Sequence, residues 1–119
     1  MQALAIDPRD VLLEKPRFGA FHSTDLEMIL RCRGIDTIII TGISMPICCD
    51  TTAREANSRD FRVFFMSDGT ATTGTDPEGL QRMTLDIIDG HFGTVLTVAE
   101  MTEMIERAVL ARDSAREAH

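Results

Sequence analysis

Two adjacent cysteines close a short segment, Gly42–Cys49, in which the residue types best suited to chemistry are found. The segment joins a β-branched apolar run to a stretch with helical spacing, so Cys48 would lie in the first turn of a helix covering Ile47–Ser58. The dipole and unpaired N–H groups of such a turn favour a thiolate and can hold a developing oxyanion. Lys15, at the end of another predicted strand, could supply the neighbouring cation. The pattern indicates a cysteine nucleophile; the alternative is that Cys48 is a small buried hydrophobic residue.

The composition excludes several other classes of function. A chain of 119 residues with 44% hydrophobic and 26% charged residues is typical of one globular domain, here residues 1–119. A net charge of −7 without a basic stripe argues against nucleic acid and anionic membranes as partners. The longest apolar run is far shorter than the ~18 residues of a membrane-spanning helix. The first residues lack the basic and apolar parts of a secretion signal, so we expect a cytoplasmic protein.

The cysteine and histidine spacing predicts neither a metal nor a cofactor. Cys32, Cys48 and Cys49 are an odd number and lack the Cys-x-x-Cys spacing of zinc or redox sites. His22 and His91 have no third ligand at a matching spacing. We therefore expect three free thiols and surface histidines.

Strands and helices alternate along the chain, and this alternation predicts the scaffold that positions Lys15 and Cys48. Strands are expected at Val11–Lys15, Asp36–Gly42, Phe61–Met66 and Thr94–Leu96, with helices after Thr24, from Ile47, after Asp76 and after Thr97. The order favours a parallel sheet with right-handed crossovers and helices on both faces, and it places ligands at the carboxyl ends of the strands. Asp68 also falls at such an end, where capping is as good an explanation as function.

Local signals mark where these elements begin and end. Thr24 and Glu27, like Thr97 and Glu100, have the spacing of a capping box. The apolar centre of Asp36–Gly42 is typical of a strand covered on both faces. Residues 111–119 are polar and are expected to be a frayed tail.

Several of these segments together resemble the isochorismatase-like cysteine hydrolases. The resemblance runs from about Asp7 to Ile105 and is carried by Lys15–Phe21, Thr24–Leu26, Gly34–Gly42, the Cys-Cys-Asp-Thr-Thr-Ala-Arg-Glu-Ala run of Cys48–Ala56, Ser67–Gly69 and Phe92–Val95. It implies a Rossmann-like α/β fold of three layers, with a mostly parallel sheet between helices. Most members of this family cleave an amide or ureide C–N bond in a small molecule, and isochorismatase itself cleaves a vinyl ether.

The family uses an Asp–Lys–Cys triad. By resemblance Cys48 corresponds to the nucleophile and Lys15 to the triad lysine, and the backbone N–H groups of Met45 and Cys48 correspond to the oxyanion hole. The family's cis peptide would fall at Ser44–Met45.

Two aromatic residues of the loop after Lys15 are candidates for substrate binding. Phe18 and Phe21 would form a pocket wall in the family's arrangement. Packing in the core is the alternative for both side chains.

The triad aspartate has no counterpart among the fourteen residues that precede Lys15, because Asp7 and Asp10 match a turn before the lysine strand. The resemblance thus predicts an N-terminally shortened fold, whose strand ending at Gly42 has a free edge that favours a homo-oligomer. Two functions are compatible with this pattern: a cysteine hydrolase, alone or completed by a partner chain, and a catalytically inactive, oligomer-forming remnant of the fold. A flavodoxin-like binding module is weaker because the sequence has no glycine-rich phosphate loop.

Overall fold

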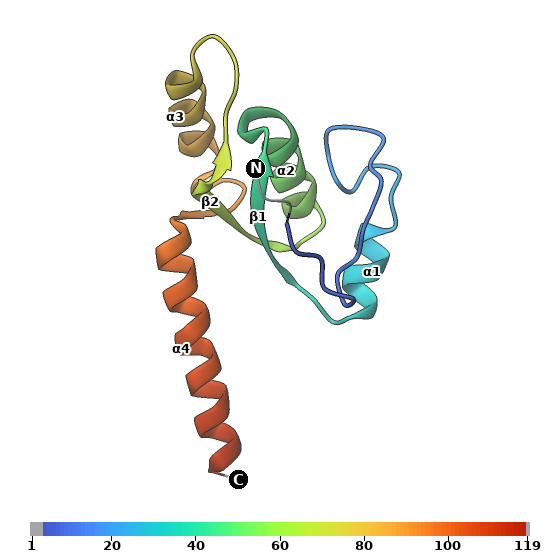
Figure 1. Cartoon of the computed structure of the whole chain (residues 1–119), viewed down its shortest axis with the longest axis vertical. Coiled ribbons are helices and arrows are strands. Elements are labelled where there is room, and N and C mark those ends of the chain that lie inside the picture. Colours follow the sequence, from blue (N-terminus) through green and yellow to red (C-terminus); the bar gives the residue numbers. More distant parts are fainter. Residues whose placement is uncertain (1–3, 119) are drawn as a thin grey trace.

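A three-stranded parallel sheet organises the structure, a computed structural model that describes residues 4–118 (Figure 1). The elements in chain order are α1 (Leu26–Cys32), β1 (Thr37–Ile43), a π-helical turn η1 (Met45–Cys49), α2 (Asp50–Ser58), β2 (Arg62–Ala71), α3 (Pro77–Ile88), β3 (Thr94–Leu96) and α4 (Val98–Glu117). The strands lie in the order β1-β2-β3. The predicted α/β fold with a parallel sheet is confirmed.

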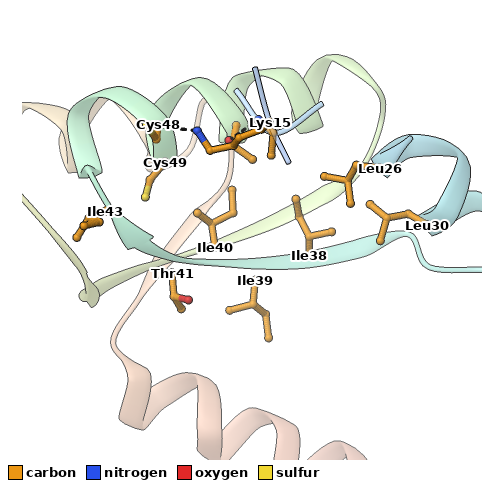
Figure 2. A pocket seen from close by; sticks show the side chains of 12 residues that line it. Lys15, Leu26, Leu30, Ile38, Ile39, Ile40, Thr41, Ile43, Cys48 and Cys49 are labelled. Atoms are coloured by element: carbon orange, nitrogen blue, oxygen red, sulfur yellow. Dashed lines mark hydrogen bonds between the residues drawn. The ribbon is translucent and has the colours of Figure 1, made fainter. Parts of the chain in front are cut away.

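The register between β1 and β2 decides which side chains share a face of the sheet. Ile38 lies opposite Val63 and Ile40 opposite Phe65, so all four side chains project from the same face. In Figure 2 Ile38 and Ile40 point toward the helices above β1, whereas Ile39 points the other way. This alternation makes one face of the sheet the floor of the core.

Helix α2 covers that face at close range. Ala53 and Ala56 are fully buried, and their small side chains bring the α2 backbone close to Val63 and Phe65. Ile88, at the end of α3, fills the same cluster and is likewise fully buried. The core therefore lies between the sheet and the α2–α3 layer.

The opposite face of the sheet is covered only where α4 begins. Met66 and Met101 are buried there, and a Cβ on Gly69 would lie 3.0 Å from the Val98 side chain. From its first turn onward α4 runs away from the sheet, as Figure 1 shows. Helices thus lie on both faces, as expected. Within residues 4–118, none of the helices has the length and apolarity needed to cross a bilayer.

Helix starts follow the local signals of the sequence in two places. The Asp76 carboxylate accepts a hydrogen bond from the Gly79 N–H at 3.1 Å, which caps α3 ahead of Pro77. Thr97 and Glu100 form both bonds of the predicted capping box, at 3.1 and 2.9 Å. The backbone N–H of Thr97 lowers the pKa of Glu100, so its carboxylate stays ionised at the helix start.

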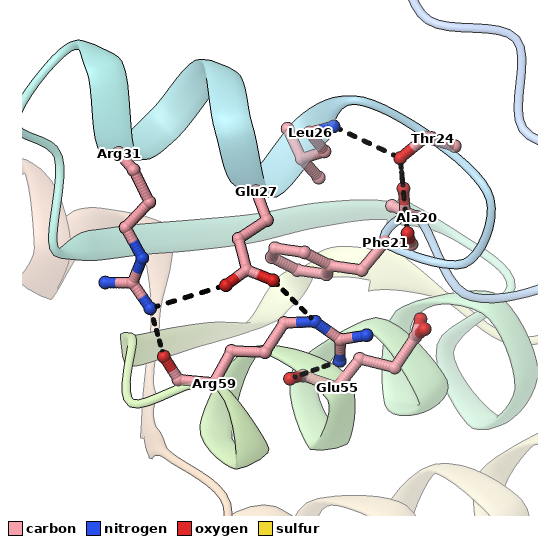
Figure 3. Close-up of polar contacts among 8 residues, drawn as sticks. All are labelled: Ala20, Phe21, Thr24, Leu26, Glu27, Arg31, Glu55 and Arg59. Carbon is pink, nitrogen blue, oxygen red and sulfur yellow. Dashed lines mark hydrogen bonds and ion pairs between the residues drawn. The ribbon is translucent and has the colours of Figure 1, made fainter.

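The first predicted capping box does not form, because its glutamate has other partners. The Thr24 hydroxyl accepts a hydrogen bond from the Leu26 N–H at 3.3 Å. Glu27 instead forms an ion pair with Arg59 at 3.2 Å, which ties α1 to the end of α2, and a second one with Arg31 of its own helix at 3.7 Å (Figure 3). A tertiary ion pair has displaced a local cap.

One predicted strand is absent, and another is longer than predicted. Val11–Lys15 is not a strand: its residues are exposed and without a ladder partner, and a short apolar run becomes a strand only where a neighbour accepts its backbone hydrogen bonds. The predicted loop Ser67–Thr70 continues β2, because Thr70 and Ala71 pair with the end of β1 after a register shift.

Two further expectations are wrong: a frayed tail from residue 111, and a strand β1 covered on both faces. Residues 111–117 are helical in α4, while residue 119 lies outside the described residues. Ile39 is 44% exposed, because α4 leaves the sheet before it can cover β1.

Neighbouring isoleucines on β1 provide a matched test of this packing. Ile40 is 7% exposed and faces the core, so Ile40→Val should lower the free energy of unfolding by about 1 kcal/mol. Ile39→Val makes the same change on the exposed face and should lower it by less than about 0.5 kcal/mol. Urea unfolding measures both. Equal losses would contradict the assignment of the two faces.

Candidate active site

Lys15 and Cys48, which are far apart in the sequence, meet beside the first turn after β1 (Figure 2). The Lys15 Nζ donates a hydrogen bond to the Cys48 Sγ at 3.7 Å. Cys48 is partly exposed and Lys15 is exposed, so both groups are accessible from solvent. The structure thus brings together the two residues on which the sequence interpretation depended.

The Lys15 ammonium group is held by the loop that follows it. Its Nζ also donates to the carbonyl oxygens of Arg17 and Phe18, each at 3.1 Å. An ammonium group has three N–H donors, and these two carbonyls together with the Cys48 sulfur account for all of them. Among the described residues, Lys15 has no carboxylate partner.

That loop is in turn fixed to α2. The Ala20 N–H donates to the Thr52 hydroxyl at 3.1 Å, and the Ala20 carbonyl accepts from the Thr24 hydroxyl at 2.6 Å. Gly19 packs so tightly on α2 that a Cβ there would lie 1.6 Å from the Glu55 carboxylate. Thr52 lies one helical turn after Cys48, so one side of the helix positions both the thiol and the loop that carries Lys15.

The turn that carries Cys48 is closed by hydrogen bonds to the Ser44 carbonyl. The N–H groups of Ile47 and Cys49 both donate to this oxygen, at 3.3 and 3.0 Å. The Met45 side chain is fully buried and anchors the turn in the core. The cis peptide bond expected at Ser44–Met45 lies one bond earlier, at Ile43–Ser44.

The two adjacent thiols have opposite environments. Cys49 is 5% exposed and belongs to the core, while Cys48 faces Lys15. Burial raises the pKa of the Cys49 thiol, and the charge of Cys48 adds to this rise, whereas Lys15 opposes it. Cys49 is therefore a packing residue, whereas Cys48 lies beside Lys15 and is partly exposed.

A groove of about 350 Å³ extends from the Lys15–Cys48 contact along β1 (Figure 2). Leu26, Leu30 and Ile38 form its apolar wall, and Lys15 and Cys48 supply polar atoms. It can accept a small molecule with its reactive carbon next to the thiol.

The two candidate aromatic residues, Phe18 and Phe21, have different environments. Phe21 is 5% exposed and stacks on Phe61 at 5.6 Å between ring centroids, so its assignment to a pocket wall is corrected to core packing. Phe18 is 62% exposed and borders a second hollow with His22 and Glu55. Its role in substrate binding stays a prediction.

Other sequence candidates have structural explanations. The Asp68 carboxylate accepts a hydrogen bond from the Val98 N–H at 2.7 Å and thus caps α4. Across residues 4–118 there is no cluster of three or more metal-ligating side chains. Sequence reasoning missed Thr52, although its spacing of four residues from Cys48 places both on one helical face.

Comparison with known proteins places this geometry in a family. The sequence profile of the isochorismatase domain matches residues 1–118. A ureidoacrylate amidohydrolase RutB from Methylorubrum extorquens is 36% identical over 98% of this chain and 44% of its own length. The RutB of Enterobacter sp. strain 638 is also 36% identical, over 92% of this chain and 46% of its own.

Solved structures agree with these sequence matches. A cysteine hydrolase from Pseudomonas syringae pv. phaseolicola 1448A superimposes with a TM-score of 0.86 and 37% identity, covering 91% of this chain and 55% of its own. An isochorismatase family protein from Burkholderia thailandensis gives a TM-score of 0.72 and 40% identity, over 79% and 48% of the two chains. This chain spans about half the length of these relatives. With its parallel sheet and the matched profile, the chain belongs to the isochorismatase family.

Proposed function

We propose that this chain carries the nucleophile and the cationic partner of a cysteine hydrolase that cleaves the C–N bond of a small amide or ureide. The observation that carries the proposal is the 3.7 Å contact between the Lys15 Nζ and the Cys48 Sγ at the end of an open groove. The names of the relatives, ureidoacrylate amidohydrolases, favour a ureide over the vinyl ether that other family members cleave.

In this proposal Lys15 stabilises the negative charge of the Cys48 sulfur and holds the sulfur at the end of the groove. The thiolate attacks the carbonyl carbon, the C–N bond breaks, and the leaving nitrogen takes up a proton from the solvent to which Cys48 is open. Water then hydrolyses the thioester, which frees the thiol and releases the acid. The backbone N–H groups of Met45 and Cys48 would stabilise the oxyanion of both steps.

Hydrolysis should depend on Cys48 and not on the other exposed thiol. The purified chain should release ammonia or amine from members of a panel of linear ureides and small amides. Cys48→Ala should reduce this rate to the background, because the covalent route is lost. Cys32→Ala, which changes an exposed thiol of α1, is the matched control and should leave it unchanged. Turnover that survives Cys48→Ala would refute the assignment, and no turnover by the native chain would favour the inactive remnant.

Thiol reactivity tests the lysine contact without any knowledge of the substrate. Iodoacetamide should label Cys48 about tenfold faster than Cys32, because the Lys15 ammonium group contacts the Cys48 sulfur and stabilises its thiolate. Cys49 should react slowest, since it is buried and its pKa is raised. Lys15→Met should remove most of the Cys48 advantage. Tandem mass spectrometry of the labelled peptides separates the adjacent cysteines, and equal rates at all three thiols would rule out an activated nucleophile.

The hydroxyl of Thr52 should be needed to hold Lys15 in place. Thr52→Val removes the acceptor of the Ala20 N–H and should lower the free energy of unfolding by about 1–2 kcal/mol. It should also slow alkylation of Cys48, because the loop that carries Lys15 is released. Thr52→Ser keeps the hydroxyl and should retain the alkylation rate. If both variants labelled Cys48 as fast as the native chain, the loop would not depend on this bond.

A further inference from the structure

A primary amine and a partly exposed thiol are in contact at the end of the groove. Lys15 is the only lysine among the 12 lysine and arginine residues of the chain, and its Nζ lies 3.7 Å from the Cys48 Sγ. A guanidinium group in this position would supply charge alone, because it stays protonated in proteins. An amine becomes a nucleophile when it loses a proton. The contact therefore joins an oxidisable sulfur to a nitrogen that can form a bond with it.

Cys48 has the two properties of a thiol that peroxides oxidise. Oxidation to a sulfenic acid requires thiolate character and access for the oxidant. The Lys15 ammonium group stabilises negative charge on the Cys48 sulfur. The side chain is partly exposed and lines a groove of about 350 Å³, which is large enough to admit hydrogen peroxide.

The other two thiols are poorly placed to capture a sulfenic acid at Cys48. Cys49 is 5% exposed, and Figure 2 shows its sulfur on the side of the turn that faces β1, whereas Cys48 lies beside Lys15. Burial raises the pKa of the Cys49 thiol and so reduces the thiolate that would attack. Cys32 lies on α1 and does not line the groove. Among the described residues, the nucleophile in contact with the Cys48 sulfur is Lys15.

The Lys15 amine is held next to the sulfur by the loop that follows it. Its Nζ donates to the carbonyl oxygens of Arg17 and Phe18, each at 3.1 Å, and the Thr52 hydroxyl fixes the same loop to α2. Groups that are held together in this way react much faster than the same groups free in solution. The flexible lysine side chain can close the remaining distance to Cys48.

We propose that Lys15 and Cys48 form a reversible covalent bond when hydrogen peroxide oxidises the thiol. The peroxide transfers one oxygen atom to the Cys48 sulfur and leaves as water, which gives a sulfenic acid. The Lys15 ammonium group releases one proton to solvent, and its nitrogen attacks the sulfur. The sulfenic hydroxyl then leaves as water with a second proton from the nitrogen. The product is a sulfenamide, in which an S–N bond has replaced the S–O bond.

The S–N bond protects the thiol and blocks its chemistry. Further oxidation of a sulfenic acid to a sulfinic or sulfonic acid is irreversible for most proteins, and capture by Lys15 prevents it. Dithiothreitol attacks the sulfur of the sulfenamide, releases the lysine amine, and in a second exchange restores the Cys48 thiol. The regulatory role of this bond rests on the proposed function, whereas the bond itself rests on the contact alone, so its test uses no hydrolysis assay.

Peptide mapping of the oxidised chain tests for the bond. The native chain is treated with hydrogen peroxide, unfolded in N-ethylmaleimide to block the remaining thiols, and digested with trypsin without a reducing agent. Trypsin cuts after arginine and does not cut between Lys15 and Pro16, so the two partners fall in residues 10–17 and 34–54. These peptides should appear joined, with one hydrogen atom lost from the sulfur and one from the nitrogen. Dithiothreitol should separate them.

Lys15→Arg is the matched control, because it keeps a positive charge beside the sulfur and removes the primary amine. This variant should give no joined peptide, and its Cys48 should proceed to the sulfinic acid. After peroxide and then dithiothreitol, iodoacetamide should label Cys48 in the native chain and fail to label it in Lys15→Arg. Cys32→Ser should still form the bond.

Four results would overturn the proposal. They are a Cys48 that peroxide leaves unchanged, a disulfide from Cys48 to Cys49 or Cys32 in place of the joined peptide, a joined peptide that persists in Lys15→Arg, and equal amounts of sulfinic acid at Cys48 in the native chain and in Lys15→Arg. A disulfide between the adjacent cysteines is recognised because it stays within residues 34–54.

Discussion

The close packing of α2 on the sheet is the contact on which the rest of the structure depends. Ala53 and Ala56 leave no side-chain bulk between the helix and Val63 or Phe65, so the helix axis has little freedom to shift. The turn η1 continues directly into α2 and inherits its orientation. A larger residue at either alanine would displace the whole layer above the sheet, and with it the thiol.

From this position the same helix performs two tasks. The turn η1, which leads directly into α2, directs Cys49 into the core and leaves Cys48 facing Lys15. One turn later the Thr52 hydroxyl accepts a hydrogen bond from the loop after Lys15. Two carbonyl oxygens of this loop accept hydrogen bonds from the Lys15 ammonium group. The site is thus built on a rigid element, and the loop contributes a side chain that is itself fully hydrogen-bonded.

The two faces of the sheet differ in how far they are covered. The α2–α3 face forms the core, whereas on the other face α4 covers Met66 and then leaves β1 exposed at Ile39. The helix that departs from the sheet leaves Met104, Ile105 and Val109 partly exposed. Apolar surface left exposed in this way has a free-energy cost in water.

Much of the fold and the core of the site could be read from the sequence because local patterns encode them. A β-branched apolar run predicted β1, a phenylalanine-rich apolar run predicted part of β2, and capping residues such as Asp76 and Thr97 marked helix starts. Only the tertiary structure decided the rest: whether Val11–Lys15 finds a strand to pair with, whether Glu27 caps α1 or binds Arg59, and whether Phe21 faces a pocket or the core. The physical reason is that local hydrogen bonds and periodicity depend on neighbours in the chain, whereas burial, ion pairing and strand pairing depend on residues that only folding brings together.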